Sequence, residues 1–207
     1  MIRSPTALCL AATVTVLISL TDRAGAANSS GDWPCAQRKV QEIALAAIWS
    51  GTPPDLAGIE WQSDPEIAGL VERLAARRTS EEEVRAAIAA LAASAGEHKR
   101  DKLLALLAGL VEEINTERAD IIAGIERRGR AQKQFAESLR AESAKYDALG
   151  ADPKADQAKL ADAGEALNWD LRVFDERQKS LRFVCEVPVL IEQRLFLLAR
   201  TIQGALK

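Results

Sequence analysis

The feature of this sequence that most constrains its fold is a long stretch in which apolar residues recur about every 3.5 residues. No proline occurs between positions 97 and 149. Alternating steps of four and three residues reach Leu107, Val111, Ile114, Arg118, Ile121, Ile125, Arg128, Gln132, Phe135, Leu139, Glu142, Tyr146 and Leu149. Nine of these thirteen positions are apolar, a pattern typical of a coiled-coil seam. One continuous helix over this stretch would be about 80 Å long.

The segment 150–153 interrupts this pattern and predicts a turn. Gly150 is a typical helix end, and Asp152 followed by Pro153 predicts the N-cap and first position of a new helix. A second seam follows at Leu160, Leu167, Leu171, Phe174, Leu181 and Cys185, with Gly164 and Gln178 as weaker members. Two long helices joined by a four-residue turn lie antiparallel. The sequence therefore predicts a helical hairpin.

The charges of this hairpin are expected to pair across the seam. Folding the chain about the predicted turn places Arg127, Arg128 and Arg130 beside Asp170, Asp175 and Glu176. The basic run 126–133 is therefore interpreted as part of a compensated stalk rather than as a patch for nucleic acid or lipid. The net charge of −3 agrees with this interpretation, because nucleic-acid binding needs a dense positive surface.

Three shorter helices are predicted before the hairpin. The first runs from position 34 or 35 to Ser50, and an irregular connection over 49–63 follows. Asp64 and Pro65 predict the start of a second helix, which ends near Arg78. The third helix is predicted to open with a capping box formed by Thr79, Ser80 and Glu83, and to end at Gly96.

These elements predict an all-α protein whose N-terminal helices pack on the base of the hairpin. Only 12 glycines and 7 prolines are present, too few for the many turns of an all-β fold. Segment 27–125, completed by 178–207, is expected to form the bundle, and 126–177 is expected to project as the tip. Pro188 is expected to bend the last helix around the core.

Residues 1–26 are expected to be a signal peptide. Arg3 supplies a positive start, an apolar run covers 7–20, and Ala24-Gly25-Ala26 provides small residues before a cleavage point. The run is shorter than the roughly 20 residues that span a bilayer. We expect a periplasmic or secreted chain that begins at Ala27 and has no membrane span after cleavage.

Cleavage would leave two cysteines, Cys35 and Cys185, because Cys9 lies within the signal. An oxidising compartment favours a disulfide between them. Two buried free thiols, or an intermolecular link, are the alternatives. A bridge over this separation would stabilise the fold by about 5 kcal/mol at most.

The search for catalytic and metal-binding patterns points away from an enzyme. The sequence has no G-x-S-x-G, no H-E-x-x-H, no phosphate loop and no dinucleotide-binding glycine pattern. His98 is the only histidine, and we interpret it as a surface residue because a metal site needs several strong ligands. No catalytic residue, cofactor or metal is therefore assigned.

The motif D-W-P-C-A-Q-R-K-V over 32–40, followed by I-W-S-G-T-P over 48–53, resembles the start of a group of uncharacterised exported bacterial helical proteins. The resemblance covers about 20 residues and implies no activity. Alongside it, Trp33 is interpreted as a cover for the Cys35 bridge, and Arg38 and Lys39 as solvent or ion-pair residues.

The function predicted from this architecture is that of an exported interaction or scaffold protein whose hairpin binds an envelope protein or a second copy of the chain. A holdase-type chaperone is the first alternative, and an enzyme acting on envelope polymers is the second. The candidate partner-binding residues are Arg128, Gln132 and Phe135 on the stalk, with Trp49 and Trp61 in the irregular connection.

Overall fold

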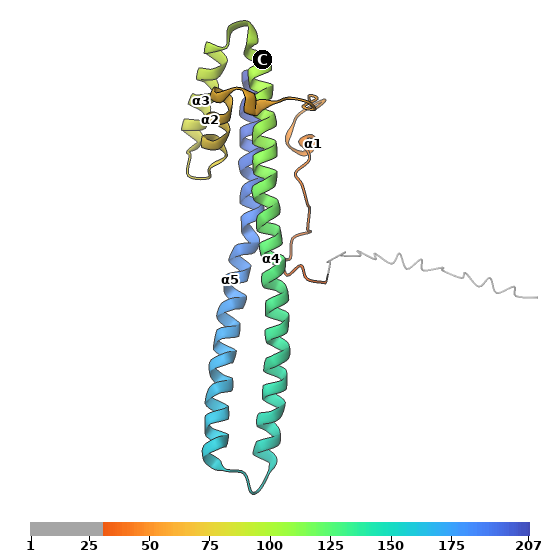
Figure 1. Ribbon diagram of the computed structural model, residues 1–207, viewed down its shortest axis with the longest axis vertical. Helices are drawn as coiled ribbons and strands as arrows, with labels where there is room; N and C mark the ends of the chain where they lie inside the picture. Colours follow the sequence, from red (N-terminus) through yellow and green to blue (C-terminus); the bar gives the residue numbers. More distant parts are fainter. Residues whose placement is uncertain (1–30) are drawn as a thin grey trace, which may run out of the picture.

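Two long antiparallel helices dominate the computed structural model, which describes residues 31–207 (Figure 1). Helix α4 comprises Lys99–Ala151 and helix α5 comprises Gln157–Ala205. Within the described residues every regular element is helical. The predicted all-α hairpin is confirmed.

The turn between the two helices differs from the prediction. Helix α4 continues through Gly150, and Asp152 accepts a hydrogen bond from the backbone N–H of Lys154 in the turn itself. The N-cap of α5 is Asp156, whose carboxylate accepts from the N–H groups of Ala158 and Lys159. A second aspartate therefore starts α5 later than the Asp152–Pro153 pattern predicts, because the first one is used to stabilise the turn.

This longer turn changes the register of the hairpin by one heptad. The predicted register places Phe174 beside Arg128, but the Phe174 ring packs against Phe135, with 5.9 Å between ring centroids. Leu171, assigned to the seam, is 45% exposed. The expected ion pairs across the seam are wrong, because none of them occurs among the salt bridges of residues 31–207. Arg130 instead forms a salt bridge with Asp32, at 3.4 Å.

Helices α2 (Pro65–Ala75) and α3 (Glu81–Ser94) pack on one side of the hairpin at its open end (Figure 1). Their predicted N-termini are confirmed: Asp64 accepts from the N–H groups of Glu66 and Ile67, and Ser80 forms a reciprocal capping box with Glu83. Helix α3 ends before Gly96, whose φ of +54° suits glycine. Two 3-10 turns, Trp61–Ser63 and Gly96–His98, precede α2 and α4.

The hydrophobic core lies where these four helices meet. Its fully buried side chains include Ile67 and Leu74 of α2, Ile88 of α3, Leu107 of α4 and Leu195 of α5. Arg194 of α5 completes this end of the molecule by donating to the carbonyl oxygens of Leu74 (2.7 Å), Ala76 (3.3 Å) and Thr79 (2.8 Å). Leu74 lies in the last turn of α2 and the other two residues follow its end, where helix geometry leaves carbonyl acceptors without partners.

The prediction of a helix from position 34 or 35 to Ser50 is wrong. Residues 31–60, which we call the strap, run along the other side of the hairpin in largely irregular form (Figure 1). They contain one helical turn, α1 (Leu45–Ile48). Side chains of α4 bind the strap backbone directly. Asn115 pairs with the N–H and carbonyl of Ile43, and Arg118 donates to the carbonyls of Val40 and Gln41. These contacts replace the hydrogen bonds that a helix would have made.

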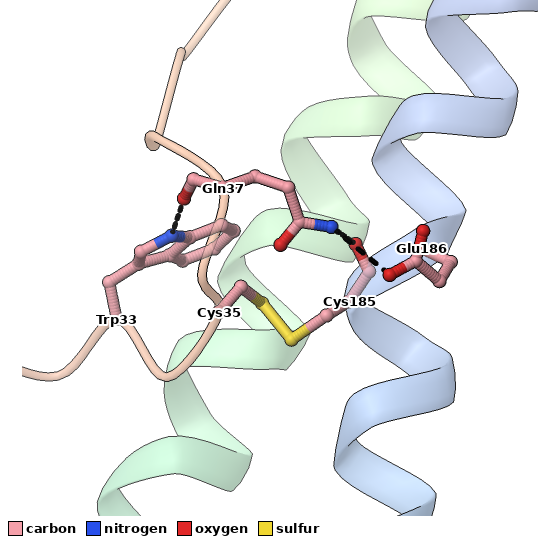
Figure 2. Close-up of a disulfide and its surroundings, with 5 residues drawn as sticks. All are labelled: Trp33, Cys35, Gln37, Cys185 and Glu186. Atoms are coloured by element: carbon pink, nitrogen blue, oxygen red, sulfur yellow. Dashed lines mark hydrogen bonds between the residues drawn. A yellow bond between two sulfur atoms is a disulfide. The ribbon is translucent and has the colours of Figure 1, made fainter.

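A disulfide between Cys35 and Cys185 ties the strap to α5, as predicted (Figure 2). Trp33 lies beside this bridge and donates from Nε1 to the carbonyl of Gln37 at 2.7 Å. Gln37 in turn donates from Nε2 to the carbonyl of Cys185 at 2.8 Å. Lys39 forms an ion pair with Glu126 of α4. The start of the strap is thus held by covalent, polar and ionic contacts together.

Pro188 lies within α5, which continues through it. Proline has no N–H for the carbonyl one turn earlier and weakens the helical bonding around it. One carbonyl in that turn, that of Cys185, accepts from Gln37. The proline and the strap therefore meet at the disulfide.

The expected signal peptide 1–26 lies outside the described residues. In the part of the chain that is described, none of the helices combines the length and the apolar character needed to cross a membrane.

Candidate functional site

A groove of about 630 Å³ opens between α4 and α5, beyond the core and toward the tip. Ten residues line it: Arg128, Ala131 and Gln132 of α4, and Trp169, Arg172, Val173, Glu176, Arg177, Ser180 and Leu181 of α5. Most of its surface is apolar, and the indole of Trp169 stands at its edge with 61% of the residue exposed. The strap contacts other residues of α4 at this level, namely Gly129, Arg130 and Lys133.

The groove continues the surface on which α2 and α3 pack. In a heptad pattern, residues separated by whole heptads face the same direction. Val173, Arg177, Ser180 and Leu181 lie two heptads before Val187, Ile191, Arg194 and Leu195. Ile191 and Leu195 are buried in the core, Val187 packs against it, and Arg194 contacts the end of α2.

The same relation holds on the other helix. Arg128 and Ala131 lie three heptads after Leu107 and Leu110, which are fully buried in the core. The hairpin therefore has one continuous face. At its open end helices α2 and α3 cover this face, and over the groove the described chain leaves it uncovered.

The charge of the groove is positive. Arg128, Arg172 and Arg177 line it, whereas Glu176 is the only acidic residue that does. Within residues 31–207 none of the three arginines forms a salt bridge, and the Glu176 carboxylate contacts Lys179 at 2.8 Å. The groove thus carries three arginines against one glutamate, on a chain whose net charge is −3.

Two of these arginines are held in place by aromatic rings. The guanidinium carbon of Arg172 lies 5.5 Å from the centroid of Trp169, and that of Arg177 lies 4.8 Å from the centroid of Phe135. Stacking on a ring leaves the N–H groups around the edge of a guanidinium free to donate. The groove therefore presents arginines that are positioned for acidic groups and that rest on apolar surface.

Gln132 and Phe135 support the groove from below. Gln132 is 9% exposed and donates from Nε2 to the carbonyl of Phe174 at 3.1 Å, which joins α4 to α5 at the groove floor. Phe135 packs against Phe174 and carries Arg177. The structure brings the predicted stalk residues Arg128, Gln132 and Phe135 together at one site, where only Arg128 and Gln132 line the groove itself.

The other two predicted residues, Trp49 and Trp61, are not among the residues that line the groove. Both pack against the core. Trp61 donates from Nε1 to Glu112 at 2.8 Å. Its ring also covers Gly109, where a Cβ would lie 2.8 Å from the nearest ring carbon. Both tryptophans are half-buried, and their contacts stabilise the fold.

Sequence reasoning missed the α5 side of the groove. Trp169, Arg172, Val173 and Arg177 were not singled out because they lie outside the expected seam of the second helix. The sequence did contain a signal. Trp169 is a large aromatic residue between the polar residues Asn168 and Asp170, and it lies opposite a polar part of the α4 seam. Its significance depended on the register, which the predicted turn misplaced.

No group of three or more potential metal ligands occurs in the described part of the chain. His98 is exposed at the start of α4. The groove contains arginines, one glutamate and one serine, and Ser180 has no histidine near it in the set of lining residues. What this arrangement offers chemically is recognition by charge and apolar contact.

Comparison with known proteins identified no relative: no family model, no curated protein and no solved structure matches the chain.

Proposed function

We propose that this chain is an exported, non-enzymatic interaction protein that binds a protein partner in the groove of its helical hairpin. The observation that carries the proposal is the groove itself, where unpaired arginines and the exposed Trp169 lie on the face that α2 and α3 cover elsewhere. Contacts rich in tryptophan and arginine dominate the binding energy of many protein interfaces.

Export is supported by the disulfide, which joins residues 150 positions apart. Such bonds persist in oxidising compartments outside the cytosol. In that setting the bond and the contacts of the strap keep the base of the hairpin rigid. A rigid base is a suitable support for a binding surface, because a preorganised site loses less conformational entropy when the partner binds.

The proposal is tested by site-specific photo-crosslinking in the cells that produce the protein. A photoreactive phenylalanine analogue replaces Ala131 inside the groove, and in the control it replaces Ala141, which is exposed on α4 outside it. We expect discrete adducts from position 131 and not from position 141. The adducts should disappear when Arg172→Glu and Arg177→Glu are introduced together, with the far-UV circular dichroism unchanged.

Three results would count against the proposal. Equal adducts from both positions would show that the groove has no special role. Adducts that survive the double charge reversal would place the partner on another surface. A broad smear of many adducts, together with suppression of aggregation of a denatured test protein, would favour the holdase-type chaperone instead.

A further inference from the structure

We propose that the occupant of the groove is an amphipathic helix of the partner protein, whose apolar stripe is flanked by acidic side chains. This inference rests on the proposed function and specifies the chemistry of the partner. It is carried by two independent observations, the geometry of the hairpin face and the charge along the groove.

The geometry indicates a helix. At the open end of the hairpin, the face that continues into the groove is covered by helices α2 and α3. Heptad spacing repeats the same positions in the groove, from Val173 to Leu181 on α5 and at Arg128 and Ala131 on α4. A segment that lies there as a third helix would extend an arrangement that this hairpin already uses.

The size of the groove agrees with this occupant. Its lining extends along α5 from Trp169 to Leu181, about 18 Å of helix at 1.5 Å per residue. That length is about three turns of a bound helix. The groove is open to solvent along one side, so one face of a bound helix contacts it and the opposite face stays in solvent. The bound segment is therefore amphipathic.

The charges indicate acidic flanks. Apolar contact is offered by Trp169, Val173 and Leu181, while Arg128, Arg172 and Arg177 carry the positive charge. Glu176, the one carboxylate in the lining, contacts Lys179 on the same helix, so three arginines face a single carboxylate. Glutamate or aspartate beside the apolar stripe of the bound helix would neutralise the arginines by charge-assisted hydrogen bonds.

The groove differs from the surface that α2 and α3 cover, and the difference suits a partner on another chain. Ile191 and Leu195 of the core correspond to Arg177 and Leu181 of the groove. An arginine in place of a buried apolar residue lowers the apolar area that a partner can bury. It also makes the binding affinity depend more strongly on charge. We therefore expect binding that weakens with salt, as exposed charge pairs do.

The test uses two synthetic helical peptides of about two heptads, close to the length of the groove. Both carry leucine at the apolar positions; one has glutamate at the flanking positions and the other has lysine. Binding of each labelled peptide to the disulfide-bonded protein is followed by fluorescence anisotropy. We expect the glutamate peptide to bind at least tenfold more tightly than the lysine peptide, and to lose affinity between 50 and 500 mM NaCl.

Charge reversal makes the test specific to the groove. The double variant Arg172→Glu, Arg177→Glu should reverse the preference, so that the lysine peptide binds more tightly. The control variant Arg140→Glu, Arg182→Glu changes the net charge equally at exposed positions outside the groove, and it should keep the original preference. Trp169→Ala should weaken binding at least fivefold, whereas Phe183→Ala, at a residue that is 77% exposed and outside the groove, should not.

Several outcomes would overturn the inference. Equal binding of the two peptides, or reversal of the preference by the control variant, would exclude binding of an acidic amphipathic helix in the groove. An anionic amphiphile is the rival ligand. We expect that neither oleate nor phosphatidylglycerol vesicles will displace either peptide. If oleate or the vesicles bind the groove variants less tightly than they bind the wild type, and neither peptide binds the wild type, the ligand is an anionic amphiphile.

These results separate the inference from the proposed function. If neither peptide binds but the adducts from position 131 still depend on Arg172 and Arg177, the groove binds a protein that is not an acidic helix. If those adducts do not depend on the two arginines, the proposed function itself is wrong.

Discussion

A Cβ atom on Gly129 would lie 2.5 Å from the backbone carbonyl oxygen of Asp32. The absence of a side chain at this position lets the start of the strap approach the middle of α4. The same strap residue is held by Arg130 and Lys133, whose side chains reach its carboxylate at 3.4 and 3.5 Å. A glycine that weakens a long helix on propensity alone is thus required by a tertiary contact.

Gly129→Ala is expected to destabilise the protein by about 1 to 3 kcal/mol, because the strap backbone must move and the packing is strained. Gly124→Ala is the matched control. A Cβ there would meet only the Arg127 guanidinium, at 3.7 Å, so this change should raise stability by about 0.5 to 1 kcal/mol through helix propensity. Urea unfolding measures both. Equal effects of the two substitutions would contradict the role assigned to Gly129.

Replacing Cys35 and Cys185 together by serine should lower the free energy of unfolding by up to about 5 kcal/mol, because the unfolded chain regains its freedom. Helix content should change little, since the strap has only one helical turn. Urea unfolding and far-UV circular dichroism check the two parts. A non-reducing peptide map of the wild type should recover the linked pair, and alkylation of both thiols in the oxidised protein would refute the bond.

Arg194→Ala should destabilise the fold by about 2 to 3 kcal/mol, because the carbonyls of Leu74, Ala76 and Thr79 lose a donor in a partly buried place. Burial lowers the pKa of Arg194, and Glu81 opposes that shift. Arg194→Lys keeps the charge but cannot reproduce the planar fork, so it should recover less than half of the loss. Arg182→Ala, at an exposed position, is the control. Thermal unfolding with amide exchange in α2 measures the effect.

The capping box of α3 predicts a dependence on pH. Hydrogen bonds from the backbone N–H and hydroxyl of Ser80 lower the pKa of Glu83 below its ordinary value. A depressed folded-state pKa adds stability that is present above the unfolded-state pKa and is lost as pH falls through the folded-state value. The melting temperatures of wild type and Glu83→Gln should therefore differ at pH 7 and converge as the pH falls through the lowered pKa of Glu83.

Glu82→Gln, in the same first turn, is the control for this experiment. It removes one charge near the helix N-terminus without removing the capping box. If the wild type and Glu83→Gln differ equally at pH 7 and pH 3, ionisation of Glu83 does not contribute to the cap.

The hairpin beyond the groove can be shortened to locate the binding surface. Removing one heptad from each helix, residues 140–146 and 162–168, preserves the heptad pairing on both sides and leaves every groove residue in place. The shortened protein should fold and bind the glutamate peptide within twofold of wild type, as measured by anisotropy. Loss of binding with intact helicity would place the partner nearer the tip.

The elements that were predicted correctly are those whose causes are local. The 3.5-residue period of the α4 seam, the Asp64–Pro65 start of α2 and the Ser80–Glu83 capping box of α3 each involve residues within a few positions of one another. The cysteine pairing was predicted because only two cysteines remain after the expected signal peptide. Of the candidate site, Arg128, Gln132 and Phe135 were found because they interrupt or mark the seam.

The predictions that failed depend on contacts between distant segments. A helix was expected after Cys35, but the strap backbone finds its hydrogen-bond partners on α4, at Asn115 and Arg118. The turn was placed at Asp152, but Asp156 caps α5. This small local difference moved every pairing across the hairpin by about one heptad.

The sequence by itself determined the helical class, the two long helices, the caps of α2 and α3 and the cysteine pair, because periodicity, capping and composition act over short distances along the chain. The tertiary structure alone decided the register of the hairpin, the path of the strap and the groove at Trp169 and Arg177. These depend on which surfaces remain exposed after α2, α3 and the strap have packed, and that outcome is a property of the whole fold.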